Sequence, residues 1–343
     1  MRPATAIVAI VAVVVMAAGA MFASCAHAAT LEEVRARGEL RCGVNIGLAG
    51  FSAPDDKGEW QGLDVDFCRA VAAAIFKDPA KVKFVPLSAK ERFTALQSGE
   101  VDLLSRNTTW SMSRDTEQGL NFVGVTYYDG QGFLVRKSLG ITSVADLAGA
   151  SICVQTGTTN ELNLADYFRT HTLTYNPVVF EKNEEAIAAY NLGRCDAYTT
   201  DSSGLYSQRI KLADPDANMV LPEIISKEPL GPAVRQGDDA WANLVQWTLF
   251  AWLNAEEMGI AQANVEQMRN SANPEIRRLL GVEGDFGRGI GLSNDWAYAI
   301  VKNVGNYGES FERNVGKGSR LNIARGYNRL WTHGGLHYAP PIR

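Results

Sequence analysis

An internal repeat constrains the fold more than any other feature of this sequence. The stretch Ala95–Leu103 (ALQSGEVDL) is followed 94 residues later by Ala189–Ala197 (AYNLGRCDA). Each copy has a glycine where a helix needs a left-handed C-terminal residue, and a strand-like segment after it. The alternative is that residues which commonly end helices and begin strands recur here by chance. The repeat predicts two similar units in one chain.

Matching segments precede the two copies. A strand is expected at Val82–Val85, before a capping box at Ser88–Glu91 that opens a helix. In the second copy a strand is expected at Pro177–Phe180, before an N-cap at Asn183 and two acidic residues that suit the helix dipole. Both repeats therefore predict a strand, a helix and a second strand.

Each half has one further strand–helix unit. The first runs from Leu40–Val44 to a helix at Val65–Phe76, and the second from Ser151–Val154 to a helix at Asn160–Phe168. Such units build parallel sheets covered by helices. We predict an α/β protein of two lobes, each a mostly parallel sheet with flanking helices.

Two segments are expected to cross between the lobes and form a two-strand hinge. Tyr128–Lys137 would leave the first lobe and Glu228–Arg235 would return to it. The expected organisation is a leader at 1–28, a first lobe at 29–136 plus 230–270, a second lobe at 137–229, and an extension at 271–343 packed on the lobes.

The N-terminus resembles a secretory signal. Arg2 is followed by an uncharged, largely apolar run and by the A-x-A site Ala26-His27-Ala28, so a cleaved signal peptide and a mature start at Ala29 are expected. An uncleaved membrane anchor and a lipid anchor on Cys25 are the alternatives. Export to the periplasm follows from the main interpretation.

Four cysteines remain after the expected cleavage. Exported thiols meet an oxidising compartment, and the correspondence of the two halves favours pairing within lobes, Cys42 with Cys68 and Cys153 with Cys195. Other pairings and free buried thiols stay open. None of the four cysteines is spaced as C-x-x-C, which argues against a zinc ribbon or a redox motif.

The repeat also locates a candidate site. Ligands of open parallel sheets bind beyond the carboxyl ends of the strands, and the offset places Asn107 and Asp201 at equivalent positions there. Two lobes that face each other would bring these strand ends to the two walls of one cleft. On the first wall, a polar loop continues from Asn107 to Arg114. The second wall adds Thr158 and Thr159 at a helix start that attracts anions.

Such a cleft suits a zwitterion. Asp201 would bind the α-ammonium, and Arg114 would bind the α-carboxylate with help from Thr109, Thr158 or Thr159. The alternative is that Asp201 and Arg114 are unrelated surface residues.

Five motifs together resemble the family 3 solute-binding proteins of polar amino-acid ABC transporters, over residues 38–260. They are Gly62-Leu-Asp-Val-Asp66, Leu96–Asp102, Thr109-x4-Arg114, Val154–Thr159 and Gly193-x2-Asp196-x4-Asp201. The loop Asn45–Phe51 and the long C-terminal extension are similar in particular to those of general L-amino-acid-binding proteins.

The resemblance implies a type II periplasmic-binding-protein fold and roles for single residues. It assigns Arg114 to the α-carboxylate, Asp201 to the α-ammonium, and Thr109 and Thr159 to supporting hydrogen bonds. Arg92 would contact an acidic or amide ligand side chain, with an ordinary surface arginine as the alternative.

The first loop departs from relatives of narrow specificity. Asn45 and Leu48 stand where many relatives have an acid and an aromatic residue, and Ala89 stands near a usual Trp or Phe. With Phe51, Asn45 and Leu48 complete the expected ligand-binding set. The departures favour broad specificity that includes glutamate, glutamine, aspartate and asparagine.

The expected partners are an L-amino acid and an inner-membrane permease with its ATPase. The chain would act as a monomer, by hinge closure, with no cofactor. A net charge of −5 without a basic stripe excludes the footprint of a nucleic-acid binder.

Signals for catalysis are weak. No G-x-S-x-G elbow or P-loop occurs, and the glycines between His333 and His337 disfavour helical metal spacing. The enzymatic rival is a periplasmic cyclohexadienyl or arogenate dehydratase on the same fold. We expect a binding protein rather than an enzyme.

Overall fold

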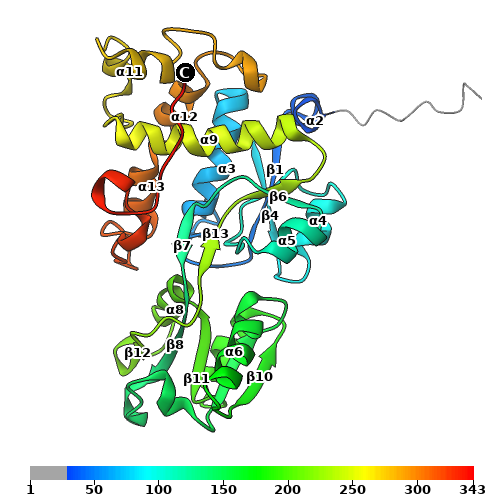
Figure 1. Ribbon diagram of the computed structural model, residues 1–343, viewed down its shortest axis with the longest axis vertical. Helices are drawn as coiled ribbons and strands as arrows, with labels where there is room; N and C mark the ends of the chain where they lie inside the picture. Colours follow the sequence, from blue (N-terminus) through cyan, green and yellow to red (C-terminus); the bar gives the residue numbers. More distant parts are fainter. Residues whose placement is uncertain (1–28) are drawn as a thin grey trace, which may run out of the picture.

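Two sheets organise the chain into two lobes (Figure 1). The computed structural model describes residues 29–343, so the expected leader at 1–28 lies outside the described residues. The two-lobe α/β fold predicted from the repeat is confirmed.

The first sheet has the strand order β4-β1-β5-β14-β6. Its strands are β1 (Leu40–Asn45), β4 (Val82–Leu87), β5 (Leu103–Leu104), β6 (Leu120–Phe122) and β14 (Ala233–Arg235). β1 pairs in parallel with β4 and β5, whereas β14 runs antiparallel to β5 and β6.

The second sheet has the order β10-β9-β11-β8-β12 and repeats the first one. Its strands are β8 (Gln131–Arg136), β9 (Ser151–Gln155), β10 (Asn176–Phe180), β11 (Ala197–Asp201) and β12 (Asn218–Val220). β9 pairs in parallel with β10 and β11, and β8 runs antiparallel to β11 and β12. Each sheet thus adds two antiparallel pairings to the parallel core that the sequence predicts.

The repeated helices are α4 (Arg92–Gln97) and α7 (Asn183–Asn191). As predicted, Gly99 and Gly193 follow them with φ of +78° and +76°. The N-cap expected at Asn183 is wrong, because Lys182 occupies that position and the Asn183 side chain accepts a hydrogen bond from the Tyr198 hydroxyl.

The remaining helices cover both sheets and the top of the first lobe. They are α2 (Thr30–Arg37), α3 (Leu63–Phe76), α5 (Met112–Glu117), α6 (Thr159–Thr170), α8 (Ser202–Arg209), α9 (Asp239–Glu257), α10 (Val265–Met268), α11 (Pro274–Leu279), α12 (Trp296–Val304) and α13 (Tyr307–Asn314). Short 3-10 turns occur at η1 (Lys137–Leu139), η2 (Val144–Leu147), η3 (Pro215–Ala217), η4 (Arg288–Ile290), η5 (Gly326–Asn328) and η6 (Trp331–His333). A small hairpin joins β2 (Ala53–Pro54) and β3 (Trp60–Gln61).

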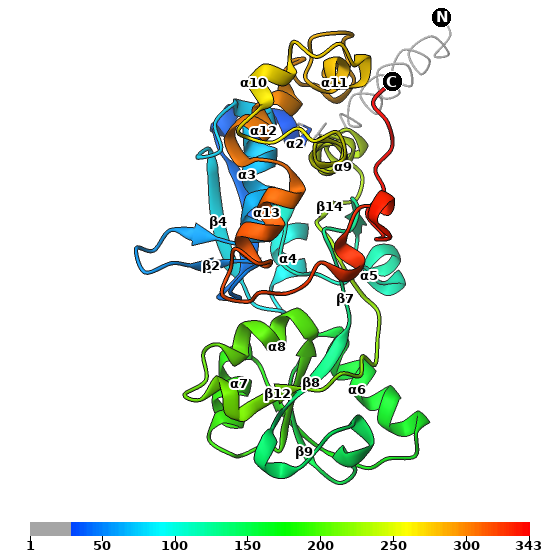
Figure 2. The same ribbon diagram turned by 90° about the vertical axis from the view of Figure 1, so that its left-hand side faces the viewer.

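The C-terminal helices share the core of the first lobe. α12 and α13 lie against α3 and α9, as the orange segments in Figure 2 show. Trp296, Ile300 and Phe311 are buried in the same apolar cluster as Phe67 of α3 and Trp252 of α9. Burying a large apolar side chain contributes roughly 1.5–3 kcal/mol, so these helices stabilise the first lobe itself.

Two antiparallel strands, β7 (Tyr127–Asp129) and β13 (Glu228–Leu230), connect the lobes, with Glu228 paired to Asp129. The single strand expected at 128–137 is broken at Gly130. A Cβ at this position would lie 2.2 Å from Ile224 and 2.8 Å from the Ser226 carbonyl oxygen. The close approach of the returning chain requires glycine there and interrupts the strand.

Both predicted disulfides are present, Cys42–Cys68 and Cys153–Cys195. The first joins β1 to α3, and the second joins β9 to the residues that lead into β11. Each bridge therefore fastens elements within one lobe and leaves the hinge free.

Replacing Cys153 and Cys195 by serine should lower the free energy of unfolding of the second lobe by roughly 3–4 kcal/mol, because the bridge closes a loop of 42 positions. Urea unfolding followed by far-UV circular dichroism measures the change. Wild-type protein under reducing conditions should approach the variant, and an unchanged urea midpoint in the variant would contradict the expectation.

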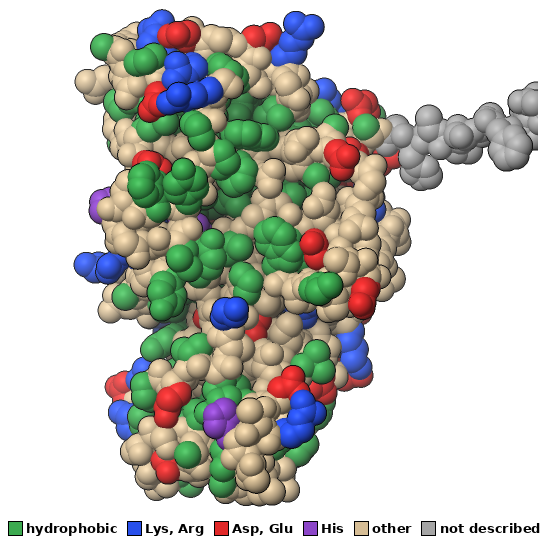
Figure 3. Space-filling view, viewed as in Figure 1, with side chains coloured by type: hydrophobic (Ala, Val, Ile, Leu, Met, Phe, Trp, Pro, Cys, Tyr) green, Lys and Arg blue, Asp and Glu red, His purple; other side chains and the backbone are tan. Residues whose placement is uncertain are grey.

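Within residues 29–343 no helix combines the length and the apolar character needed to cross a bilayer. On the face drawn in Figure 3, Lys and Arg side chains alternate with Asp and Glu rather than gathering into one basic patch.

Candidate functional site

A cavity lies between the lobes, where the carboxyl ends of β1, β5, β9 and β11 face one another. Polar side chains from both lobes form most of its wall. The lining residues are Asn45, Leu48, Arg92, Arg106, Asn107, Thr109, Gln155, Thr158, Thr159, Asn160, Asn183, Thr200, Asp201 and Gly204. The cavity therefore occupies the place where ligands of such sheets bind.

The structure brings most of the predicted site residues to this cavity. Eight of them line it, namely Asn45, Leu48, Arg92, Asn107, Thr109, Thr158, Thr159 and Asp201. Arg114 and Phe51 are not among the lining residues. The Arg114 guanidinium donates to the carbonyl oxygen of Thr109 at 2.9 Å, directly behind the wall. The Phe51 ring packs edge-on against Tyr127, with ring centroids 5.1 Å apart.

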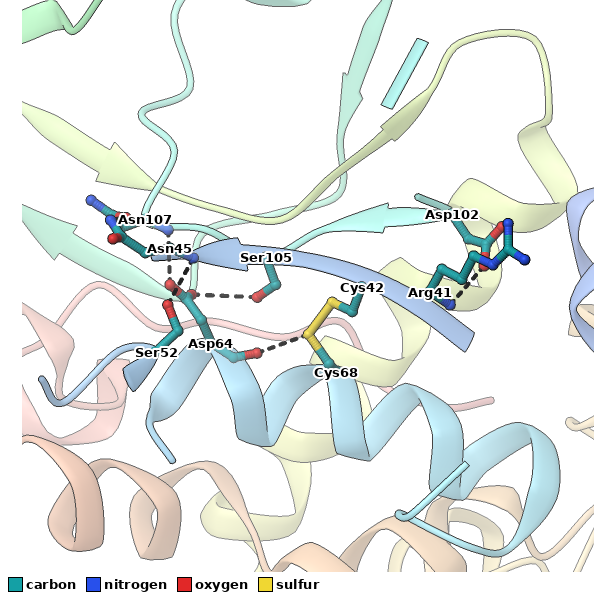
Figure 4. Close-up of a disulfide and its surroundings, with 9 residues drawn as sticks. All are labelled: Arg41, Cys42, Asn45, Ser52, Asp64, Cys68, Asp102, Ser105 and Asn107. Carbon is teal, nitrogen blue, oxygen red and sulfur yellow. Dashed lines mark hydrogen bonds between the residues drawn. A yellow bond between two sulfur atoms is a disulfide. The ribbon is translucent and has the colours of Figure 1, made fainter. Parts of the chain in front are cut away.

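An unusual backbone conformation shapes the first-lobe wall. Asn107 has a φ of +34°, and its N–H donates to the Asp64 carboxylate at 2.8 Å. The Asn45 side chain donates to the Asn107 side chain at 2.9 Å (Figure 4). Burial raises the pKa of Asp64 to about 6. The Cys42–Cys68 bridge holds α3, and with it Asp64, against β1.

Three buried guanidiniums gather on the first lobe. Arg92, Arg106 and Arg114 are only 3%, 3% and 6% exposed, and none forms a salt bridge with a residue in the described part of the chain. Burial, followed by repulsion from Arg106 and Arg114, lowers the pKa of Arg92 well below its usual value. Burial also lowers the pKa of Arg106 to about 10.

The hydrogen bonds of these arginines leave donors unused. Arg106 Nε donates to the Leu87 carbonyl oxygen at 2.9 Å, and Arg92 makes a long contact of 3.4 Å to Thr108. The buried Nε of Arg92 has no partner within residues 29–343. Buried charges are normally paired, so this wall calls for an anionic ligand group.

The second-lobe wall carries the opposite charge. Asp201 ends β11 and begins α8, and its Oδ1 accepts from the Asn160 amide at 2.9 Å. Burial raises the pKa of Asp201 well above its usual value, and the carboxylates of Glu228 and Asp129 raise it further. Thr158 caps α6 by accepting from the Glu161 N–H. A cationic ligand group would be stabilised here.

Several functional residues escaped the prediction from sequence. Arg106 precedes Asn107 at the same strand end, so the argument that located Asn107 could have found it. Glu228 gave no such signal, although it accepts hydrogen bonds from Thr109 and Thr159. Asp201 and Arg114, the pair expected to hold the zwitterion, are therefore part of a larger set of charges.

Binding of an ammonium group at Asp201 should release a proton. Because its pKa is raised, the Asp201 carboxyl of the free protein keeps its proton to a higher pH than an ordinary aspartate does, and a bound cation favours the ionised form. Affinity should therefore rise with pH until the raised pKa is passed, and fall in acid. Calorimetry in two buffers of different ionisation enthalpy measures this proton. An Asp201→Asn variant should lose the dependence, and a wild-type heat independent of the buffer would contradict it.

Comparisons with known proteins find relatives over most of the chain. Residues 40–262 match the bacterial extracellular solute-binding proteins, family 3. The chain is 64% identical to the general L-amino acid-binding periplasmic protein AapJ of Rhizobium johnstonii, over 94% of this chain and 96% of that one. It is 56% identical to the glutamate/glutamine/aspartate/asparagine-binding protein BztA of Rhodobacter capsulatus, over 96% and 97%.

A solved structure shares the whole fold. The periplasmic binding protein of an ABC transporter from Brucella ovis, with glutathione bound, superposes with a TM-score of 0.91 and 64% identity. The match covers 92% of this chain and all of that one.

Proposed function

Because the chain belongs to family 3 of the bacterial extracellular solute-binding proteins, we propose that it captures L-amino acids in the periplasm for an ABC importer. The fold is that of the type II periplasmic binding proteins. Its relatives AapJ and BztA are amino-acid-binding proteins, which supports this role.

One observation carries the proposal: opposite charges face each other across a cavity between two hinged lobes. Asp201 stands on the second lobe, and Arg92 and Arg106 stand on the first. A zwitterion supplies both missing counter-charges, its ammonium to Asp201 and its carboxylate to a guanidinium. Each charge-assisted hydrogen bond contributes roughly 1.5–3 kcal/mol, so a few of them give about micromolar affinity or better.

The number of guanidiniums favours acidic and amide ligands. One α-carboxylate satisfies one arginine, whereas Arg92, Arg106 and Arg114 are all buried. A side-chain carboxylate or amide oxygen would occupy a second one. We therefore propose broad specificity that includes glutamate, glutamine, aspartate and asparagine.

Hinge closure is the proposed mechanism. Contacts between the lobes include the ion pair of Lys90 with Glu181 at 2.6 Å and the hydrogen bond from the Ser207 hydroxyl to the Ala49 carbonyl oxygen at 2.6 Å. Lys211 donates to the Gly47 carbonyl oxygen at 2.9 Å. A ligand that touches both lobes adds its contacts only to the closed form and shifts the population toward it.

Titration of ligand-stripped protein against the proteinogenic amino acids tests the proposal. Glutamate, glutamine, aspartate and asparagine should bind at about micromolar concentration or below, and lysine and arginine should bind far more weakly. Failure to bind any amino acid would refute the proposal.

Glutathione is a second candidate ligand, because the Brucella ovis structure contains it. Its γ-glutamyl group carries the same α-ammonium and α-carboxylate as glutamate. The same titration with reduced glutathione distinguishes a site that accepts both from one that closes only on free amino acids.

A purely binding role is also part of the proposal. The similarity to solute-binding proteins favours it over the dehydratase alternative. Incubation with prephenate or arogenate, followed by detection of an aromatic product, would reveal such an enzyme. The predicted end of the first lobe at residue 136 is wrong, because β8 (Gln131–Arg136) lies in the second sheet. We further propose that the protein is a periplasmic monomer, exported by the leader at 1–28, and that its closed form docks on a membrane permease.

A further inference from the structure

Glu228 lies where the hinge and both lobes meet. It belongs to the hinge strand β13 and is 1% exposed. Its Oε2 accepts hydrogen bonds from Thr109 of the first lobe at 2.5 Å and from Thr159 of the second lobe at 2.8 Å. Its Oε1 accepts from Asn163 at 2.6 Å and from Ser226 at 2.7 Å.

These four bonds use the hydrogen-bonding capacity of the carboxylate. A carboxylate offers about four acceptor positions, two on each oxygen. All four are occupied by side chains of the protein, so Glu228 has no position left for a ligand. Its influence on the cavity must act through the groups that it holds.

The two threonines are the groups that reach the cavity. A hydroxyl has one proton to donate and two lone pairs to accept with. Thr109 and Thr159 both line the cavity, and each spends its proton on Glu228. Their oxygens lie 3.3 Å apart, so two adjacent oxygens present lone pairs, and no proton, to whatever the cavity binds.

We propose that Glu228 is a positioning residue that makes Thr109 and Thr159 acceptors for the α-ammonium of the ligand. This inference rests on the proposed function, because it concerns the same amino-acid site. With Asp201, the two hydroxyl oxygens give the ammonium acceptors from both lobes. The α-carboxylate is then left to the guanidiniums, whereas the sequence predicted a cleft in which Thr109 or Thr159 helps to bind the α-carboxylate.

Thr159→Val separates the two roles directly. We compare binding of L-glutamate with binding of glutarate, which has both carboxylates and no ammonium. If Thr159 accepts from the ammonium, the variant loses about ten- to hundredfold in affinity for glutamate and keeps its affinity for glutarate. If Thr159 donates to a carboxylate, both ligands lose affinity alike, which would overturn the proposal.

Glu228→Gln tests the positioning itself. With the amide oxygen taking Asn163 and Ser226, the amide N–H groups face the threonines and turn their protons toward the ligand. The preference for glutamate over glutarate should fall about tenfold or more. Glu223→Gln is the matched control, since Glu223 accepts from the Val144 N–H and does not line the cavity, and it should keep the wild-type preference.

The remaining outcomes distinguish a failure of the role proposed for Glu228 from a failure of the proposed amino-acid-binding function. An unchanged preference in Glu228→Gln, with a normal unfolding midpoint, would overturn the role of Glu228. Wild-type protein that binds glutarate as tightly as glutamate would overturn the ammonium site. Wild-type protein that binds no amino acid would instead refute the proposed function.

Discussion

Asp201→Asn should weaken the binding of every amino acid by about a hundredfold or more, because breaking one side of a buried charge pair costs 2–5 kcal/mol. Asp201 lines the cavity, and its Oδ1 accepts from the Asn160 amide. The other nearby acids are already engaged, Asp129 by Ser203 and Glu228 by four donors. No neighbouring carboxylate can replace Asp201. Isothermal titration with L-glutamate measures the loss.

A matched control for this prediction lies directly before the same strand. Asp196 precedes β11, accepts hydrogen bonds from the N–H and hydroxyl of Ser151, and does not line the cavity. Asp196→Asn should bind glutamate like the wild type. Equal affinity in Asp201→Asn and Asp196→Asn would remove the proposed ammonium site.

The fold was predictable where its determinants are local. The repeated glycines, the alternation of strands and helices, and the pairing of cysteines within lobes depend on short segments, and each appears in the structure. The break at Gly130 depends on contact with Ile224, which is distant in sequence. No local pattern could have located it.

The C-terminal helices show the same limit. They repeat neither lobe, so the pairing of α12 with α3 could not be read from periodicity. The sequence predicted an extension packed on the lobes, but not the surface against which it packs. In the structure Trp296 joins the core of the first lobe.

The sequence predicted the position of the site, but it did not predict all of its charged residues. Strand-end reasoning placed Asn107 and Asp201, and both line one cavity. Glu228 escaped because its partners Thr109 and Thr159 are 119 and 69 positions away. A lone acid in a short apolar strand gives no hint of such partners.

The arginines should differ in what they discriminate. Arg114→Ala should lower the affinity for all amino acids alike, by about a hundredfold, because the resemblance assigns it the α-carboxylate that every ligand shares. Arg92 lines the cavity with an unpartnered Nε. Arg92→Ala should therefore lower the affinity for glutamate about tenfold or more, while the affinity for alanine changes little.

Titration of both variants with glutamate, glutamine and alanine separates these roles. Arg169→Ala is the control, since Arg169 is exposed on α6 and pairs with Asp166. Arg114 lies behind the wall, whereas Arg106 lines it. If Arg114→Ala keeps its affinity for glutamate, the α-carboxylate belongs to Arg106 instead. If Arg92→Ala lowers the affinities for alanine and glutamate equally, Arg92 binds the α-carboxylate. The preference for acidic side chains must then come from another residue.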